Sequence, residues 1–133
     1  MAGLYTFPDS AETFPQGIRP NPNIPGITPD PDQFLRVPAY VLVGERDVGE
    51  QSLNETEQIE TEEGNTRLER GRRWVGAMRT AAKARGFDTD YGYFTLPRSR
   101  HSFHQCMRKG GMGTLTFRLL FGDPIKPSAD KEQ

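Results

Sequence analysis

The chain has 133 residues, 34% of them hydrophobic and 26% charged, which fits a single domain with a modest core. Its formal net charge of -1 gives no whole-protein reason to expect a nucleic-acid or anionic-membrane partner. The single cysteine, Cys106, excludes an internal disulfide framework and fits a reducing compartment. No apolar run approaches the roughly 18 residues that span a bilayer, and the N-terminus lacks the features of a signal peptide. We therefore expect a cytoplasmic protein.

The first segment, 1–37, is rich in proline: residues 1–38 carry eight of the eleven prolines. Because proline removes a backbone donor and disfavours helices and central strands, we predict an extended, irregular segment here. It also carries large apolar side chains, among them Phe14, Ile24 and Phe34, which a simple linker does not need. We expect it to wrap over a surface that something else supplies in part or in whole.

The first strand is predicted at 38–44, an apolar and β-branched run without alternation that is typical of a parallel strand covered on both faces. It stops at Gly44, and Asp47 follows in the loop. The stretch 54–63 is acidic.

A long helix is predicted at 66–85. Thr66 and Glu69 are placed as a capping box at its start, and Gly86 is placed to end it. Its apolar face comprises Leu68, Val75, Met78 and Ala82, widened by Trp74, Ala77 and Ala81.

The same helix is basic and allows two interpretations. Its positive side chains are Arg67, Arg70, Arg72, Arg73, Arg79, Lys83 and Arg85. They could form a phosphate-binding face for nucleic acid. We favour a solvated face that acidic neighbours balance, with Glu63 and Arg67, and Glu69 and Arg73, at i,i+4 spacing.

The second strand is predicted at 91–96, where Pro97 ends it, and His101 lies in the loop beyond. Glycines at 110, 111 and 113 each cost about 1 kcal/mol in a helix interior. They predict a break and a new helix at 114–121. Residues 123–133 are predicted to be a polar tail.

Asp47 and His101 are the candidate catalytic residues. Because loops at the carboxyl ends of neighbouring parallel strands meet at one edge of the sheet, we expect a carboxylate–imidazole contact of about 2.6–3.2 Å. His104 is the rival base. Cys106 is predicted to be a buried apolar side chain. Two histidines and one cysteine at this spacing do not suggest a zinc site, and we expect no cofactor.

Residues 34–122 resemble the C-terminal part of an α/β-hydrolase. In that family a strand ending in Gly-x-x-Asp supplies the triad acid, which residues 44–47 match. The next strand leads through a Pro-Gly-x-x-His-Ser-like turn to the triad histidine, which residues 97–102 match, and the Leu-Phe-Gly at 120–122 is similar to the end of the closing helix. The helix start at 64–72 is similar to a bacterial subgroup of hydrolases. The resemblance implies an α/β-hydrolase-like portion at 38–122.

The resemblance also implies roles and one gap. Asp47 would be the triad acid and His101 the general base for an ester-like small-molecule substrate. The family nucleophile lies in a Gly-x-Ser-x-Gly turn, and none of the serines has that frame. These are Ser10, Ser52, Ser99, Ser102 and Ser128. Since the family order is Ser, Asp, His, we expect the nucleophile upstream of Met1.

Two hypotheses from different classes follow. The first is an esterase-like α/β-hydrolase represented without its nucleophile, and inactive as this chain. The alternative is a non-catalytic α/β fragment that binds a partner to complete its sheet. Because an unpaired strand edge pairs with whatever is available, we also expect self-association, with no nucleic-acid or membrane partner.

Overall fold

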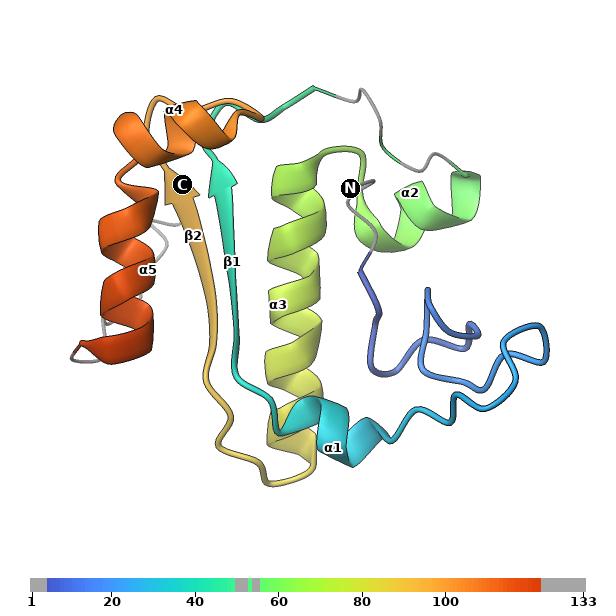
Figure 1. Ribbon diagram of the computed structural model, residues 1–133. Helices are drawn as coiled ribbons and strands as arrows, with labels where there is room; N and C mark the ends of the chain where they lie inside the picture. Colours follow the sequence, from blue (N-terminus) through green and yellow to red (C-terminus); the bar gives the residue numbers. More distant parts are fainter. Residues whose placement is uncertain (1–4, 50–52, 54–55, 123–133) are drawn as a thin grey trace.

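The computed structural model describes residues 5–49, 53 and 56–122, so the predicted tail at 123–133 lies outside the described residues. The elements are α1 (Pro31–Leu35), β1 (Ala39–Gly44), α2 (Glu57–Glu63), α3 (Arg67–Ala84), β2 (Tyr91–Leu96), α4 (Phe103–Arg108) and α5 (Met112–Phe121) (Figure 1). The predicted strand–helix–strand–helix order of an α/β fold is confirmed.

The sheet formed by the described residues is a parallel pair. β1 and β2 run in register from Ala39 opposite Tyr91 to Gly44 opposite Leu96, with α3 as the crossover along one face (Figure 1). We predicted burial on both faces, whereas most of β1 is only partly buried. Because the strands are parallel and in register, both end at the same edge of the sheet.

α3 begins and ends where its caps predict. The Thr66 hydroxyl accepts the Glu69 N–H at 3.2 Å, and the Glu69 carboxylate reaches back to accept the N–H of Asn65 at 2.9 Å. Gly86 takes a left-handed φ of 71° just beyond the helix, as a C′ glycine does. The helix itself is one residue shorter at each end than 66–85, since Thr66 and Arg85 are the caps.

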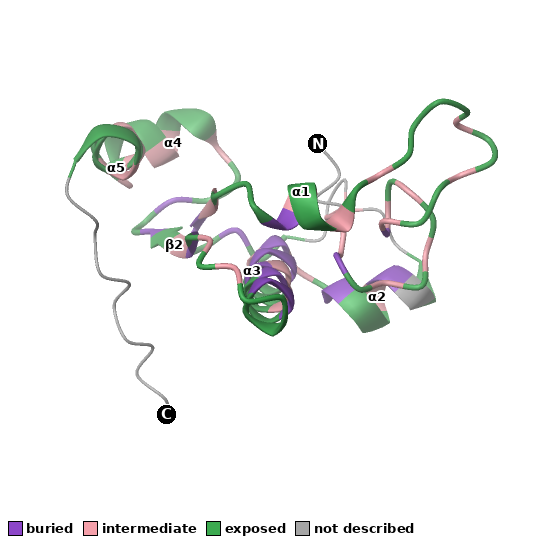
Figure 2. Ribbon diagram, turned by 90° about the horizontal axis from the view of Figure 1, so that it is seen from below, coloured by how far each residue is buried: buried purple, intermediate pink, exposed green. Residues whose placement is uncertain are grey.

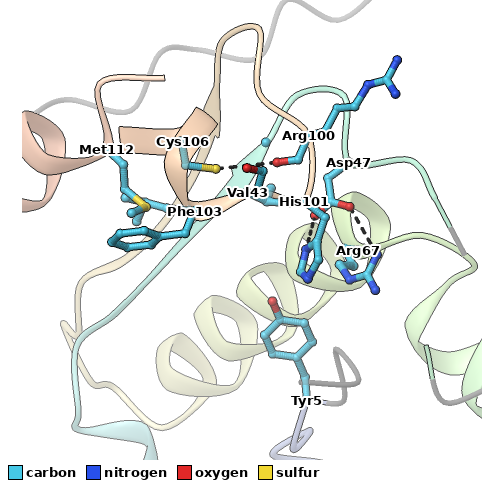
Figure 3. Close-up of a pocket in the computed structure, with 12 residues that line it drawn as sticks. Tyr5, Val43, Asp47, Arg67, Arg100, His101, Phe103, Cys106 and Met112 are labelled. Atoms are coloured by element: carbon cyan, nitrogen blue, oxygen red, sulfur yellow. Dashed lines mark hydrogen bonds and ion pairs between the residues drawn. The ribbon is translucent and has the colours of Figure 1, made fainter. Parts of the chain in front are cut away.

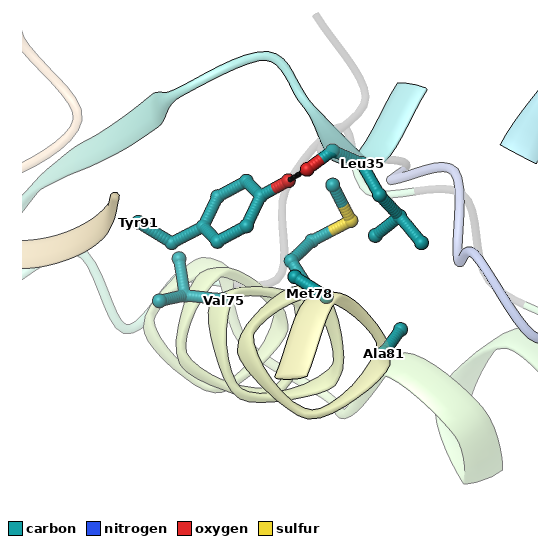
Figure 4. Close-up of a cluster of buried hydrophobic side chains, with 6 residues drawn as sticks. Leu35, Val75, Met78, Ala81 and Tyr91 are labelled. Atoms are coloured by element: carbon teal, nitrogen blue, oxygen red, sulfur yellow. Dashed lines mark hydrogen bonds between the residues drawn. The ribbon is translucent and has the colours of Figure 1, made fainter. Parts of the chain in front are cut away.

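The core lies between α3, α1 and the start of β2 (Figure 4). Its buried side chains are Leu35, Val75, Met78, Ala81, Ala82 and Tyr91. The Tyr91 hydroxyl donates to the Leu35 carbonyl at 2.7 Å, so the one polar atom of this ring is satisfied inside the core. Most of the predicted apolar face of α3 is therefore in the core.

The N-terminal segment is irregular from residue 5 to 30, apart from one isolated bridge, but α1 at 31–35 corrects the expectation that it holds no helix. The Asp30 carboxylate accepts the N–H groups of Asp32 and Gln33 at 2.9 and 3.2 Å. Pro31 occupies the first helical position, where its missing N–H has no helical partner to lose.

The surface that this segment covers belongs to the same chain. Tyr5 stacks on Trp74 of α3 at 5.3 Å between ring centroids, and the Trp74 indole N–H donates to the carbonyl of Thr6 at 2.8 Å. The Tyr5 N–H donates to the Glu63 carboxylate at 3.3 Å. Residues 5 and 6 are thus tied to α2 and α3.

Two helices differ from the sequence prediction. α2 forms within the acidic stretch, because the Thr56 hydroxyl accepts the Ile59 N–H at 3.2 Å and Ile59 is buried. The predicted glycine break is confirmed at Gly111, which has a left-handed φ of 68°. α5 starts at Met112 rather than at 114, because only Gly111 needs the left-handed conformation.

α4 and α5 have no buried residue, and the buried residues gather around α3 instead (Figure 2). We call the exposed apolar side chains of these two helices the α4–α5 apolar group: Phe103, Met107, Phe117, Leu120 and Phe121. Within the described part of the chain, no helix is both long and apolar enough to cross a membrane.

Candidate active site

The loops after β1 and β2 are tied together at the shared edge of the sheet. The Arg46 N–H donates to the Ser99 carbonyl at 2.9 Å, and the Glu45 N–H donates to the Leu96 carbonyl at 3.0 Å. Gly44 makes this approach possible, since a Cβ there would lie 2.5 Å from the Ser99 carbonyl oxygen. The loop that carries Asp47 is therefore held against the loop that leads to His101.

Asp47 and His101 meet at the distance that the sequence analysis predicts. The Asp47 Oδ2 lies 2.8 Å from the His101 Nδ1 (Figure 3). Because an ionised carboxylate only accepts hydrogen bonds, Nδ1 is the donor, and Nε2 is left to accept a proton. The predicted geometry is confirmed for His101 rather than for His104, while the catalytic role of either residue stays a prediction.

The two members of the pair differ sharply in burial. The Asp47 side chain is 5% exposed, whereas the His101 side chain is 63% exposed. A buried carboxylate costs free energy unless it is paired and hydrogen-bonded. The carboxylate is therefore held inside the protein, and the imidazole presents most of its surface outward.

Arg67 is the second partner of Asp47, and the sequence analysis did not place it in the site. Its Nη1 lies 3.2 Å from the Asp47 Oδ1 and also donates to the Gly49 carbonyl at 3.0 Å (Figure 3). As the first residue of α3, Arg67 lies near the edge where the strands end. No local pattern in the sequence marks this contact, because it depends on the path of the loop after β1.

The view of α3 as a solvated basic face is confirmed for five exposed basic side chains, Arg72, Arg73, Arg79, Lys83 and Arg85, but it needs correction at the start of the helix. Arg67 and Arg70 are both buried, and the Arg70 Nε donates to the Gly64 carbonyl at 2.8 Å. The predicted pair of Glu69 and Arg73 is present at 3.9 Å. The start of the helix uses its positive charge inside the fold, which a count of charges along the sequence does not reveal.

A cavity of about 440 Å³ opens beside the pair. Leu42, Val43, Phe103 and Met112 give it an apolar side, and Asp47, Arg67, His101 and Tyr5 also line it (Figure 3). Its volume falls in the range of small-molecule sites, which combine apolar walls with a few polar groups.

The serines nearest to His101 have structural partners. Ser99 is buried, and its hydroxyl lies 3.1 Å from both the Pro97 and the Gln105 carbonyls. The Ser102 hydroxyl caps α4 by accepting the Gln105 N–H at 3.4 Å. The Ser99 hydroxyl is thus used inside the fold, whereas Ser102 is the N-cap of α4 and also lines the cavity.

Cys106 and Glu63 are two other titratable groups near this edge of the sheet. Cys106 lines the cavity and is partly exposed rather than buried as predicted, with its Sγ 3.7 Å from the Arg100 carbonyl.

Burial raises the pKa of the Glu63 carboxyl, and the Tyr5 N–H partly opposes that shift. Among the residues that the structure describes, no group of three or more His, Cys, Asp or Glu side chains is gathered as for a metal ion.

The described residues thus form a parallel strand–helix–strand unit of an α/β fold, with an acid and a histidine in the loops that follow its strands. A solved structure with this likeness is LpqC, a poly(3-hydroxybutyrate) depolymerase from Bordetella parapertussis, with a TM-score of 0.64 and 22% sequence identity. The match covers 96% of the present chain but 40% of LpqC. The chain matches no protein-family model and no curated protein. At this identity the likeness shows the fold alone.

Proposed function

We propose that the chain carries the acid and the base of an esterase-like hydrolytic site, without the nucleophile. The observation that supports this is the 2.8 Å contact between Asp47 and His101 beside the cavity. In such a site the imidazole takes the nucleophile's proton through Nε2 and later returns it to the leaving group. Asp47 would fix the tautomer and stabilise the imidazolium.

An ester is the substrate class that we propose, because the structural neighbour is named for a polyester, poly(3-hydroxybutyrate). The apolar side of the cavity suits the carbon chain of a small ester. No Gly-x-Ser-x-Gly turn occurs in the sequence, and both nearby serines are engaged in structural hydrogen bonds. On this proposal the chain by itself lacks the group that would attack the ester.

The test is to supply the nucleophile. The part of LpqC that has no counterpart in this chain would be fused to it, and hydrolysis of an activated ester would be measured. We expect activity that falls at least a hundredfold in Asp47→Asn and His101→Ala, in line with what acid–base catalysis contributes, roughly 10²- to 10⁴-fold. His104→Ala is the matched control and should retain full activity. An active fusion that keeps its rate without His101 would contradict the proposal.

A second candidate function is an interaction module whose partner completes the sheet. The observation that favours it is the exposed α4–α5 apolar group, together with a sheet that has two strands within the described residues. Two strands rarely form a stable sheet alone. A strand-bearing partner or a second copy of the chain would extend the sheet and cover these side chains.

Sedimentation at micromolar concentration tests this second function. We expect the wild-type chain to self-associate, and the double variant Phe117→Ser/Leu120→Ser to do so less. A compact wild-type monomer with a cooperative unfolding transition would contradict it.

A further inference from the structure

We infer that Arg67 is a positioning residue, which fixes the Asp47 carboxylate so that Oδ2 faces His101. The inference rests on the proposed function, because it assigns a role within the same Asp47–His101 pair. The observation that carries it is a bridge. A single nitrogen of Arg67, Nη1, contacts the Asp47 Oδ1 at 3.2 Å and the Gly49 carbonyl at 3.0 Å.

Burial identifies Arg67 as the partner that compensates the Asp47 charge. The side chains of Asp47 and Arg67 are 5% and 10% exposed, so both charges are removed from water together. His101 is largely exposed, and its imidazole is positively charged only when it is protonated, so it does not compensate the Asp47 charge in its neutral form. The contact with Arg67 therefore persists while the imidazole takes up and releases a proton.

The geometry of the bridge explains how it would orient the carboxylate. Because Oδ1 is engaged by Nη1, the other oxygen is the one directed at the His101 Nδ1 at 2.8 Å. The bond to Gly49 ties the far side of the same loop to the start of α3. Rotation of the carboxylate and movement of the loop are thus opposed by one side chain from a rigid helix.

The positive charge of Arg67 would weaken the attraction between the Asp47 carboxylate and a protonated His101. A positive charge next to Asp47 reduces the attraction between its carboxylate and an imidazolium, because it offsets part of the negative charge. Arg67 thus does not strengthen the pair by charge, and its contribution is orientation. The measurement that reports orientation is the tautomer of neutral His101, since a carboxylate held against Nδ1 keeps the proton on Nδ1.

The experiment is nitrogen NMR of the full chain with labelled histidine, at a pH where His101 is neutral. Wild type, Arg67→Met, Arg67→Lys and Asp47→Ala, which removes the acceptor oxygens, would be compared. The matched control is Arg73→Met, which removes an arginine from the same helix at a side chain that pairs with Glu69. In wild type and control we expect the Nδ1–H tautomer to be the major form of His101. Arg67→Met should make it the minor form, and Arg67→Lys should lie between, because an ammonium keeps the charge without the planar fork.

The variants separate this inference from the proposed function. If Asp47→Ala leaves the His101 tautomer unchanged, the pair itself is not formed in solution, and both proposals are overturned. If Asp47→Ala changes the tautomer while Arg67→Met and Arg67→Lys do not, the role of Arg67 is overturned and the pair stands. Should Arg67→Met fail to fold by its amide spectrum, Arg67→Lys decides, because it retains the buried charge.

Discussion

The two sides of this molecule are packed to very different degrees. On one side, α3, α1 and the start of β2 share a continuous core, and the Tyr91 hydroxyl inside this core is hydrogen-bonded. Within α4 and α5 no residue is buried, although six of the ten residues of α5 are large and apolar. Figure 2 shows the contrast in burial.

The difference in burial separates the part of the fold that covers its own apolar side chains from the part that does not. An apolar helix is stabilised when its face is buried against another element, and α5 lacks such burial within the described residues. Asp47 and His101 lie at the border, with the acid anchored to the α3 side by Arg67 and the base preceding α4. Asp47, the member of the pair that Arg67 anchors, therefore belongs to the well-packed side.

The largest expected effect is on the free energy of unfolding, measured for one leucine from each side. Leu35→Ala removes a side chain that is 0% exposed and should lower the free energy of unfolding by about 3 kcal/mol, within the range for buried Leu→Ala changes. Leu120→Ala, at a side chain that is 62% exposed, should change it by no more than about 0.5 kcal/mol. Urea unfolding of both variants is the measurement. An equal cost at Leu120 would show that α5 is buried in solution.

Two glycines on α3 differ in the space around them. A Cβ at Gly71 would lie 2.8 Å from the Val41 Cγ1, whereas a Cβ at Gly76 would meet nothing within 4 Å. Gly71→Ala should therefore destabilise by about 1–3 kcal/mol through overpacking against the sheet. Gly76→Ala should stabilise by about 0.5–1 kcal/mol, as expected at an open helix position. Thermal unfolding distinguishes them, and two changes of the same sign would mean that the helix does not contact β1 as described.

The sequence predicted part of each region: the strands and α3 but not α1 on the well-packed side, and the Asp47–His101 contact but not Arg67 at the site. The strands, α3 and its caps follow from local signals, namely β-branched runs, the Thr66 cap and Gly86. α1 was missed because Pro31 was read as a helix breaker, although the first helical position tolerates it. Arg67 was missed because its contact with Asp47 depends on the path of a loop that no local pattern encodes.

Weakening the contact between the N-terminal segment and α3 should lower the free energy of unfolding by a moderate amount. Trp74→Phe keeps a ring for stacking on Tyr5 but removes the indole donor to the Thr6 carbonyl. A hydrogen bond of this kind contributes about 1 kcal/mol, so we expect a loss of that size in urea unfolding. Limited proteolysis should also cut the N-terminal segment faster than in wild type. Unchanged cleavage would argue against the contact.

The smallest expected effect is on the way that the stability of the protein depends on pH. Burial holds the pKa of Glu63 above its usual 4.5, so the folded protein binds this proton more tightly than the unfolded chain does. This contribution to stability is present below pH 4.5 and is lost as the pH rises through the raised pKa. Glu63→Gln should therefore lose less stability over that range than wild type does, when denaturant unfolding is repeated at several pH values. Glu57→Gln, at an exposed position of the same helix, should keep the wild-type pH dependence.

We propose that this chain holds the acid and base of a hydrolytic site but not its nucleophile. The most direct test is the rate at which the 133-residue chain hydrolyses an activated ester, compared with the same chain carrying His101→Ala. We expect equal rates, because His101 has no group to activate. A turnover well above background that disappears in His101→Ala would contradict the claim and would mean that Ser99, Ser102 or a second copy of the chain supplies the nucleophile.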